Sequence, residues 1–102
     1  MKIHLIRYNF KGVVKERYLL VICLMAKQEK YIEQNLERLG KRLKELRKAK
    51  GYKNYEQFAF DNNISRAQYG RYENGQDLRF SSLCRVLKAL DVSLEEFFND
   101  FE

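Results

Sequence analysis

The segment from Ser65 to Arg71 carries side chains that are suited to hydrogen bonding with nucleic acid bases. Two arginines, Arg66 and Arg71, flank Ala67 and Gln68. A guanidinium group can donate two parallel hydrogen bonds to a guanine edge, a glutamine amide can pair with adenine, and an alanine methyl can contact the methyl of thymine. These four residues could therefore read bases if one helix presents them outward.

The residues that carry most enzyme and metal chemistry are scarce. His4 is the one histidine, and no phosphate-binding Gly-Lys-Ser/Thr loop, GxSxG or HExxH motif occurs. Cys23 and Cys84 are far apart, and neither belongs to a CxxC pair. We therefore expect no enzyme, no metal site and no cofactor. Two isolated cysteines also favour a reducing, cytoplasmic location.

The charge of the chain is positive and unevenly placed. Lys and Arg number 20 against 14 Asp and Glu, which gives a net charge of +6 over 102 residues. Residues 1–24 hold five cations and one anion, so residues 25–102 hold only the remaining +2. Positions 38–53 carry eight cations and one anion, whereas 91–102 carry five anions and no cation. This balance favours an acidic partner: a nucleic acid, an anionic membrane or an acidic protein.

The elements that would hold these residues read as helices. Apolar residues spaced by four and three positions predict a first helix from about residue 29 that ends at Gly51; they are Ile32, Leu36, Leu39, Leu43 and Leu46. The same spacing could form a coiled-coil seam, but a short run favours a face packed on a core.

Turn and capping signals predict a short helix, a turn and a second helix. The first opens at Asn54 or Tyr55 and ends at Asp61, and Asn62–Asn63 breaks it because asparagine tolerates the left-handed region. Ser65, with Gln68 three residues later, predicts a capping box at the start of the next helix, which ends near Asn74-Gly75.

Two more helices complete the expected set. Ser81 or Ser82 would start the fourth, and Ser93 with Glu96 forms a second capping box for a fifth helix through Phe98. Aromatic and apolar residues expected in the core are Phe58, Ala59, Tyr69, Tyr72, Phe80, Leu83, Val86, Leu87, Leu90 and Phe97. The sequence therefore predicts an all-α domain of five helices that contains a helix-turn-helix.

The residue pattern of this segment resembles that of the phage Cro and repressor-like (XRE-type) DNA-binding family. The residues that carry the resemblance are Phe58-Ala59, Asn63-Ile64-Ser65, Tyr69, Tyr72, Glu73-Asn74-Gly75, and Leu83, Leu87, Leu90-Asp91-Val92-Ser93 and Phe97-Phe98. The resemblance covers about residues 36–99 and implies a five-helix, lambda-repressor-like fold.

What the resemblance implies can be placed residue by residue. Arg47 and Glu73 match a family ion pair between the first and third helices. Base-reading positions fall on Arg66, Ala67, Gln68 and Arg71, and the family's phosphate-contacting position falls on Asn54 or Tyr55. Asn74 after the recognition helix and Arg79 in the loop beyond it are further candidates for phosphate contacts because of their place in the chain. This sequence departs from the family pattern at Asn63, which replaces a turn glycine, and at Gly70 inside the recognition helix. Gly70 could let backbone approach either DNA or a neighbouring helix.

Residues 1–28 form an N-terminal extension to the domain at 29–102. Ile3–Phe10 is prone to form a strand, Gly12 is a breaker, and Tyr18–Ala26 is a nine-residue apolar run, too short to span a bilayer as a helix. Three readings stay open: a spurious or poorly ordered extension, an added strand or helix that packs or dimerises, or a signal or membrane segment.

We therefore expect a sequence-specific regulator that binds double-stranded DNA, acts as a repressor and forms a homodimer on DNA, without a membrane or metal partner. Residues 1–26 and the Phe98–Phe101 patch are the candidate dimer surfaces. The alternative is a protein-interaction or antitoxin-like module on the same fold, which the low charge of residues 25–102 supports.

Overall fold

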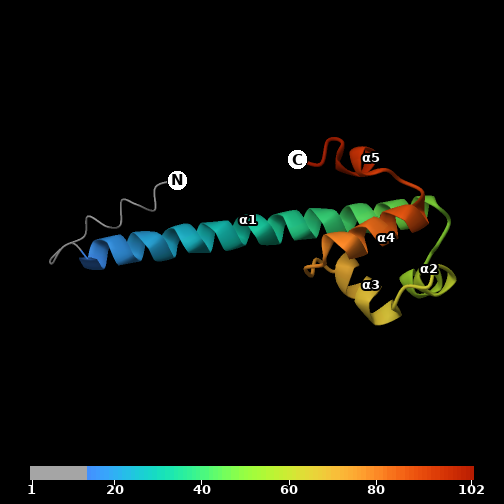
Figure 1. Cartoon of the computed structure of the whole chain (residues 1–102), viewed down its shortest axis with the longest axis horizontal. Coiled ribbons are helices and arrows are strands. Elements are labelled where there is room, and N and C mark those ends of the chain that lie inside the picture. The colour runs from blue at the N-terminus through green and yellow to red at the C-terminus, as the bar shows by residue number, and fades with distance from the viewer. Residues whose placement is uncertain (1–13) are drawn as a thin grey trace. The chain divides into compact units, whose positions relative to one another are not determined.

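The computed structural model describes the backbone of residues 14–102 and the side chains of residues 18–102. These residues form five α-helices and no strand (Figure 1): α1 (Val14–Ala49), α2 (Tyr55–Asp61), α3 (Arg66–Glu73), α4 (Phe80–Leu90) and α5 (Leu94–Phe98). The all-α, five-helix fold expected from the sequence is confirmed. The strand-prone stretch Ile3–Phe10 lies outside the described residues.

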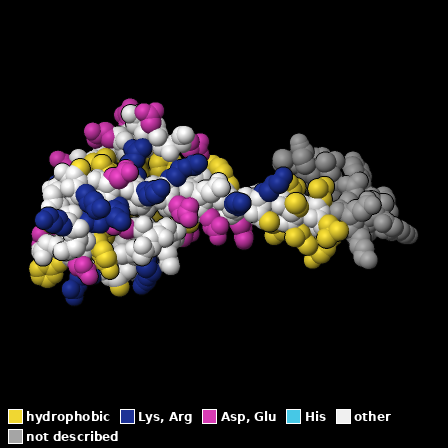
Figure 2. Space-filling model, turned by 180° about the vertical axis from the view of Figure 1, so that it is seen from behind, with side chains coloured by type: hydrophobic (Ala, Val, Ile, Leu, Met, Phe, Trp, Pro, Cys, Tyr) yellow, Lys and Arg dark blue, Asp and Glu magenta, His cyan; other side chains and the backbone are white. Residues whose placement is uncertain are grey.

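Helix α1 begins at Val14, so the predicted start near residue 29 was wrong. The apolar run Tyr18–Ala26 hid this part of the helix because an unbroken run has no period of 3.6 residues. Apolar side chains gather around this stretch (Figure 2). None of the helices among the described residues combines the length and hydropathy that crossing a membrane requires. The domain boundary after residue 28 stays a prediction, and the chain divides into a unit up to Ile32 and a unit from Glu33.

The core of the second unit draws on all five helices. Its buried residues are Leu39 and Leu43 of α1, Phe58 and Ala59 of α2, Tyr69 and Tyr72 of α3, Leu83, Val86, Leu87 and Leu90 of α4, and Phe97 of α5. Leu46, Ile64 and Val92 are partly buried against this core. The helical spacing read from the sequence therefore identifies most of the core.

Two residues expected in the core are exposed. Phe80 is 62% exposed and Ile32 is 53% exposed. Phe80 is the first residue of α4, and side chains of a helix point toward its N-terminus, so this ring points off the helix end. Ile32 is the last residue of the first unit, and it is not one of the residues packed on the core cluster of the second.

Side-chain caps begin α2, α3 and α5. The Asn54 side chain accepts from the Gln57 amide at 2.8 Å, and Ser93 with Glu96 forms the expected capping box. Ser65 Oγ accepts from the Gln68 amide at 3.3 Å, which is half of the predicted box. Helix α4 begins at Phe80 rather than Ser81 or Ser82, because the extended backbone of Arg79 forms the cap without a side-chain hydrogen bond.

The chain after α5 is fastened to α1 by one arginine. The Arg42 guanidinium donates to the carbonyls of Phe97 at 2.9 Å, Asn99 at 3.2 Å and Asp100 at 3.3 Å. The ring of Phe98 packs edge-on against Phe97 at a centroid distance of 4.9 Å. Arg42 therefore serves the packing of the C-terminal segment.

Candidate nucleic-acid interface

Helices α2 and α3 and the turn between them form a helix-turn-helix. Asn63 has φ of 59°, the left-handed conformation expected for an asparagine that replaces a turn glycine. The Ile64 amide donates to the Ala59 carbonyl at 2.8 Å, and the Phe58 and Tyr69 rings pack with centroids 5.1 Å apart. The turn and this aromatic contact hold α3 against α2.

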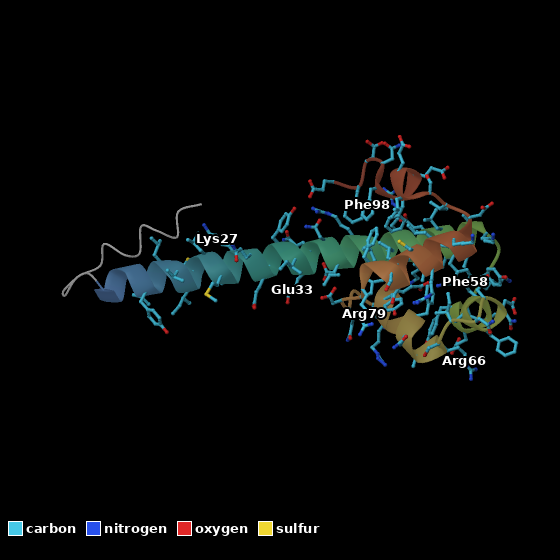
Figure 3. All side chains as sticks on the ribbon, viewed as in Figure 1. Lys27, Glu33, Phe58, Arg66, Arg79 and Phe98 are labelled. Carbon is cyan, nitrogen blue, oxygen red and sulfur yellow. The ribbon has the colours of Figure 1, made fainter. Side chains whose placement is uncertain are left out.

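Helix α3 separates an anchoring face from an outward face. Tyr69, Gly70 and Tyr72 are buried, and Glu73 is nearly so. The four residues predicted to read bases are all exposed; they are Arg66, Ala67, Gln68 and Arg71. Arg66 points away from the domain at the start of α3 (Figure 3). The Gln68 side chain takes no part in the Ser65 cap, which uses the Gln68 backbone amide. The side-chain carboxamide of Gln68 is therefore available to a ligand.

Gly70 faces a neighbouring helix rather than the outer surface of α3. A Cβ at this position would lie 2.9 Å from Cε1 and 3.1 Å from Oη of Tyr55, the first residue of α2. The Tyr55 ring is half-buried and packs 6.3 Å from Tyr69, centroid to centroid. The structure thus answers the question left open by the sequence: Gly70 gives room to the Tyr55 ring.

Arg47 and Glu73 form a buried, two-pronged ion pair between α1 and α3. Arg47 Nε lies 2.8 Å from Glu73 Oε2, and Nη2 lies 2.9 Å from Oε1. Their side chains are 3% and 7% exposed. Arg47 Nη1 also donates to the carbonyls of Tyr52 and Lys53 at 2.9 and 2.8 Å. The hydrogen bonds to Glu73 raise the pKa of Arg47 above its ordinary value, so this group stays charged.

Tyr69 places a hydroxyl in the same interior. Its Oη is buried and makes no well-formed hydrogen bond among the described residues, but it lies close enough to Glu73 and Arg47 to interact with both side chains. Burial raises the pKa of Tyr69 well above its ordinary value because the ionised phenolate would lose its hydration.

Gly40 lets α1 and the end of α3 touch at their backbones. A Cβ here would lie 2.6 Å from the carbonyl oxygen of Glu73 and 2.8 Å from that of Tyr72. This role of Gly40 was not predicted from the sequence. A signal was present, since a glycine inside a helix costs stability unless something needs the space.

The residues predicted to contact phosphates lie around the helix-turn-helix at element ends. Asn54 caps the N-terminus of α2, Asn74 caps the C-terminus of α3, and Arg79 precedes α4. All three are exposed, whereas Tyr55 is half-buried against Gly70. These positions lie at the ends of the elements that also carry the outward face of α3.

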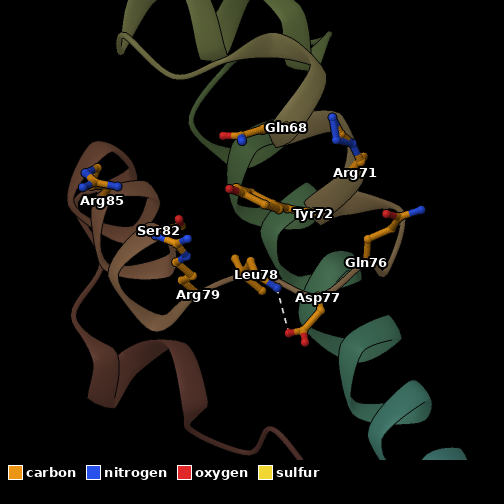
Figure 4. A pocket seen from close by; sticks show the side chains of 9 residues that line it. All are labelled: Gln68, Arg71, Tyr72, Gln76, Asp77, Leu78, Arg79, Ser82 and Arg85. Atoms are coloured by element: carbon orange, nitrogen blue, oxygen red, sulfur yellow. Dashed lines mark hydrogen bonds between the residues drawn. The ribbon is translucent and has the colours of Figure 1, made fainter.

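A polar groove of about 450 Å³ lies between α3 and α4 (Figure 4). Gln68 and Arg71 line it from α3, and Arg79, Ser82 and Arg85 line it from the other side. In the loop between the helices, the Asp77 carboxylate accepts a hydrogen bond from the Leu78 amide at 2.8 Å. Arg85 is exposed and was not among the sequence candidates, because its place opposite α3 depends on the packing of α4.

Comparisons with known proteins agree with this geometry. A helix-turn-helix family model matches residues 43–97, more than half of the chain. The chain is 35% identical over 66 residues to control protein C.MunI of a Mycoplasma species, an alignment that covers 64% of this chain and 89% of that protein. No solved structure matches. The chain therefore belongs to the repressor-like (XRE-type) helix-turn-helix family of DNA-binding transcription regulators.

Proposed function

We propose that this protein is a sequence-specific repressor that reads the major groove of double-stranded DNA with α3. The observation that carries the proposal is the division of α3 into a buried anchoring face and an exposed face with two arginines and a glutamine. A helix of this kind fits the major groove, where side chains near its N-terminus reach base edges. Base reading is assigned to Arg66, Ala67, Gln68 and Arg71.

Phosphate contacts would fix the register of α3 in the groove. We assign them to Asn54, the N-terminus of α2 with Tyr55, Asn74 and Arg79, and add Arg85 from the wall of the α3–α4 groove. Arg79 and Arg85 bring positive charge to the surface beside α3. This charge would compensate for the low net charge of residues 25–102.

The test begins by selecting bound duplexes from a random pool, followed by shift assays at fixed salt. Arg66→Ala with Arg71→Ala should abolish discrimination between the selected duplex and a random one, since each bidentate arginine–guanine contact contributes about 1–3 kcal/mol. The matched control is Lys44→Ala with Lys48→Ala, which removes two exposed cations of α1. Normal specific binding by the arginine double variant would show that the reading face is wrongly assigned.

The same assay separates DNA binding from the alternative function. A protein-interaction module would show no binding to duplex DNA even at low salt, where phosphate contacts are strongest. Repression itself needs transcription: the protein should lower transcript yield from a promoter that overlaps the selected site. An increase in yield would instead identify an activator.

Occupancy by two copies is part of the proposal, because one such domain reads few bases and specific sites of this kind are usually read by a dimer. The proposed place of action is the cytoplasm. A stoichiometry of one copy per selected site at saturation would contradict the dimer.

A further inference from the structure

The N-terminal part of α1 exposes large apolar side chains that the described residues leave uncovered. Six of them between Tyr18 and Met25 are 46–65% exposed; they are Tyr18, Leu19, Leu20, Ile22, Leu24 and Met25. Ile32 is 53% exposed on the same helix. Soluble proteins that keep such a patch open commonly use it as an interaction site.

The spacing within this patch has the period of a coiled coil. Tyr18, Ile22, Met25, Glu29 and Ile32 step by four and three residues, the seven-residue repeat that keeps one seam facing a partner helix. Four of these five positions are apolar and exposed. We refer to Tyr18, Ile22, Met25, Glu29 and Ile32 as the α1 seam. In the sequence its spacing joins that of the leucine stripe at 36–46 without a break.

We infer that the α1 seam is the self-association surface of this protein, and that it packs against the α1 seam of a second copy. The α1 seam shares no residue with the outward face of α3, so we expect association without DNA. The residues available are sufficient: the exposed parts of Leu19 and the four apolar seam residues amount to on the order of 500 Å² a copy. Two copies reach about 1,000 Å², the lower bound for a specific interface.

Glu29 determines the direction of pairing. In a parallel, in-register pair, the two Glu29 carboxylates would face each other across the seam, and like charges that close repel. An antiparallel pair that sets Ile22 opposite Ile32 of the second copy instead sets Glu29 opposite Met25. The α1 seam therefore pairs antiparallel.

The first experiment measures self-association of the full chain without DNA by sedimentation equilibrium. Ile22→Asp, in the seam, should weaken association at least about tenfold, and Glu29→Leu, which completes the apolar seam, should strengthen it by about tenfold. Leu20→Asp is the matched control, because it makes the same kind of change two positions away on a face outside the seam. It should change association less than about threefold.

Several results would overturn the inference. One is a wild-type chain that stays monomeric at high concentration. Another is an equal effect of Ile22→Asp and Leu20→Asp on self-association. A third is loss of self-association in Phe98→Asp but not in Ile22→Asp. The last result would place the interface at the C-terminal aromatic patch. Binding to anionic vesicles without self-association would identify the patch as a membrane contact. Helicity measured by circular dichroism confirms that each variant is folded.

Cysteine crosslinking tests direction in a chain with Cys23→Ser and Cys84→Ser. A mixture of Ile22→Cys and Ile32→Cys proteins should form a mixed disulfide, and Ile22→Cys alone should not. A disulfide between two Ile22→Cys chains would overturn the antiparallel arrangement. None of these measurements contains DNA. Self-association through the α1 seam can therefore be disproved while DNA reading by α3 stands, and DNA reading can be disproved while self-association stands.

Discussion

At the scale of single residues, Arg47 links three parts of the domain: α1, the end of α3 and the segment before α2. It pairs with Glu73 at the end of α3 and donates to two carbonyls of the segment before α2. A buried ion pair adds little net stability by itself, since burial costs both charges their hydration. Its loss on one side is costly, because the remaining charge stays buried without a partner.

Arg47→Ala should therefore destabilise the domain by about 3–5 kcal/mol, as measured by urea denaturation. The variant leaves the Glu73 carboxylate, 7% exposed, and the carbonyls of Tyr52 and Lys53 without their donor. Lys48→Ala removes an exposed cation next to it on α1 and should change stability by less than about 0.5 kcal/mol. A loss below about 1 kcal/mol for Arg47→Ala would contradict the bridging role.

Because Tyr69 is buried with a raised pKa, we expect the domain to lose stability at alkaline pH. Below about pH 10 the Tyr69 phenol is neutral in both the folded and the unfolded chain. Above that pH the phenol ionises in the unfolded chain, but it stays neutral in the folded chain because burial raises its pKa there. The unfolded state then binds fewer protons, so stability falls as pH rises, by up to about 1.4 kcal/mol per pH unit. Tyr69→Phe should reduce this slope, as measured by denaturation between pH 9 and 11.

At pH 7 the same variant should differ from wild type by less than about 1 kcal/mol, because the buried hydroxyl that it removes interacts with Glu73 and Arg47 without forming a well-aligned hydrogen bond to either. A loss of several kcal/mol for Tyr69→Phe at pH 7 would contradict this expectation and show a strong hydrogen bond from the hydroxyl to the Arg47–Glu73 pair.

At the scale of helices, two glycines determine how closely α3 approaches its neighbours. Gly40 admits the carbonyls at the end of α3, and Gly70 admits the Tyr55 ring from α2. Both glycines lie inside helices, where alanine has the higher intrinsic propensity by about 1 kcal/mol. Packing therefore overrides propensity at both positions.

Gly40→Ala should be the more destabilising of the two alanine substitutions, by about 1–3 kcal/mol relative to Gly70→Ala. At Gly40 the added carbon would meet backbone oxygens of Glu73 and Tyr72, which cannot move without shifting α3. At Gly70 it meets the end of a side chain that can rotate away. Thermal denaturation of both variants gives the comparison, and an equal or reversed order would contradict the close approach at Gly40.

The sequence predicts the helices well where local signals decide. Asn54, Ser65 and Ser93 begin their helices as expected, and Asn63 takes the left-handed turn conformation. It fails where tertiary packing decides: the approach of α3 to Gly40 depends on elements that are far apart in the chain. The early start of α1 was missed for a different reason, because an unbroken apolar run carries no helical period.

At the scale of the whole molecule, the position of charge matters more than its sum of +6. Arg79 and Arg85 line the groove beside α3, and Arg42 is occupied by carbonyls at the C-terminal end. The total charge therefore overstates what DNA would encounter.

Salt dependence of DNA binding should reveal this difference. Arg79→Ala and Arg85→Ala should each make the negative slope of log K against log salt less steep by about 0.9. Each should also weaken binding to the specific and the random duplex by the same factor. Lys48→Ala changes the net charge equally on α1 and should leave the slope within about 0.3. Equal slopes for all three variants would indicate that only the overall field attracts DNA.

The separation of α3 into two disjoint residue sets has a consequence for how such a protein could change its target. Tyr69, Gly70, Tyr72 and Glu73 fasten the helix, and none of them belongs to the outward set at 66, 67, 68 and 71. Substitutions in the outward set can therefore change which bases α3 recognises without changing how α3 packs on the domain. A library randomised at those four positions should retain folded members throughout, so operator preference can diverge among descendants without any compensating repair of the interior.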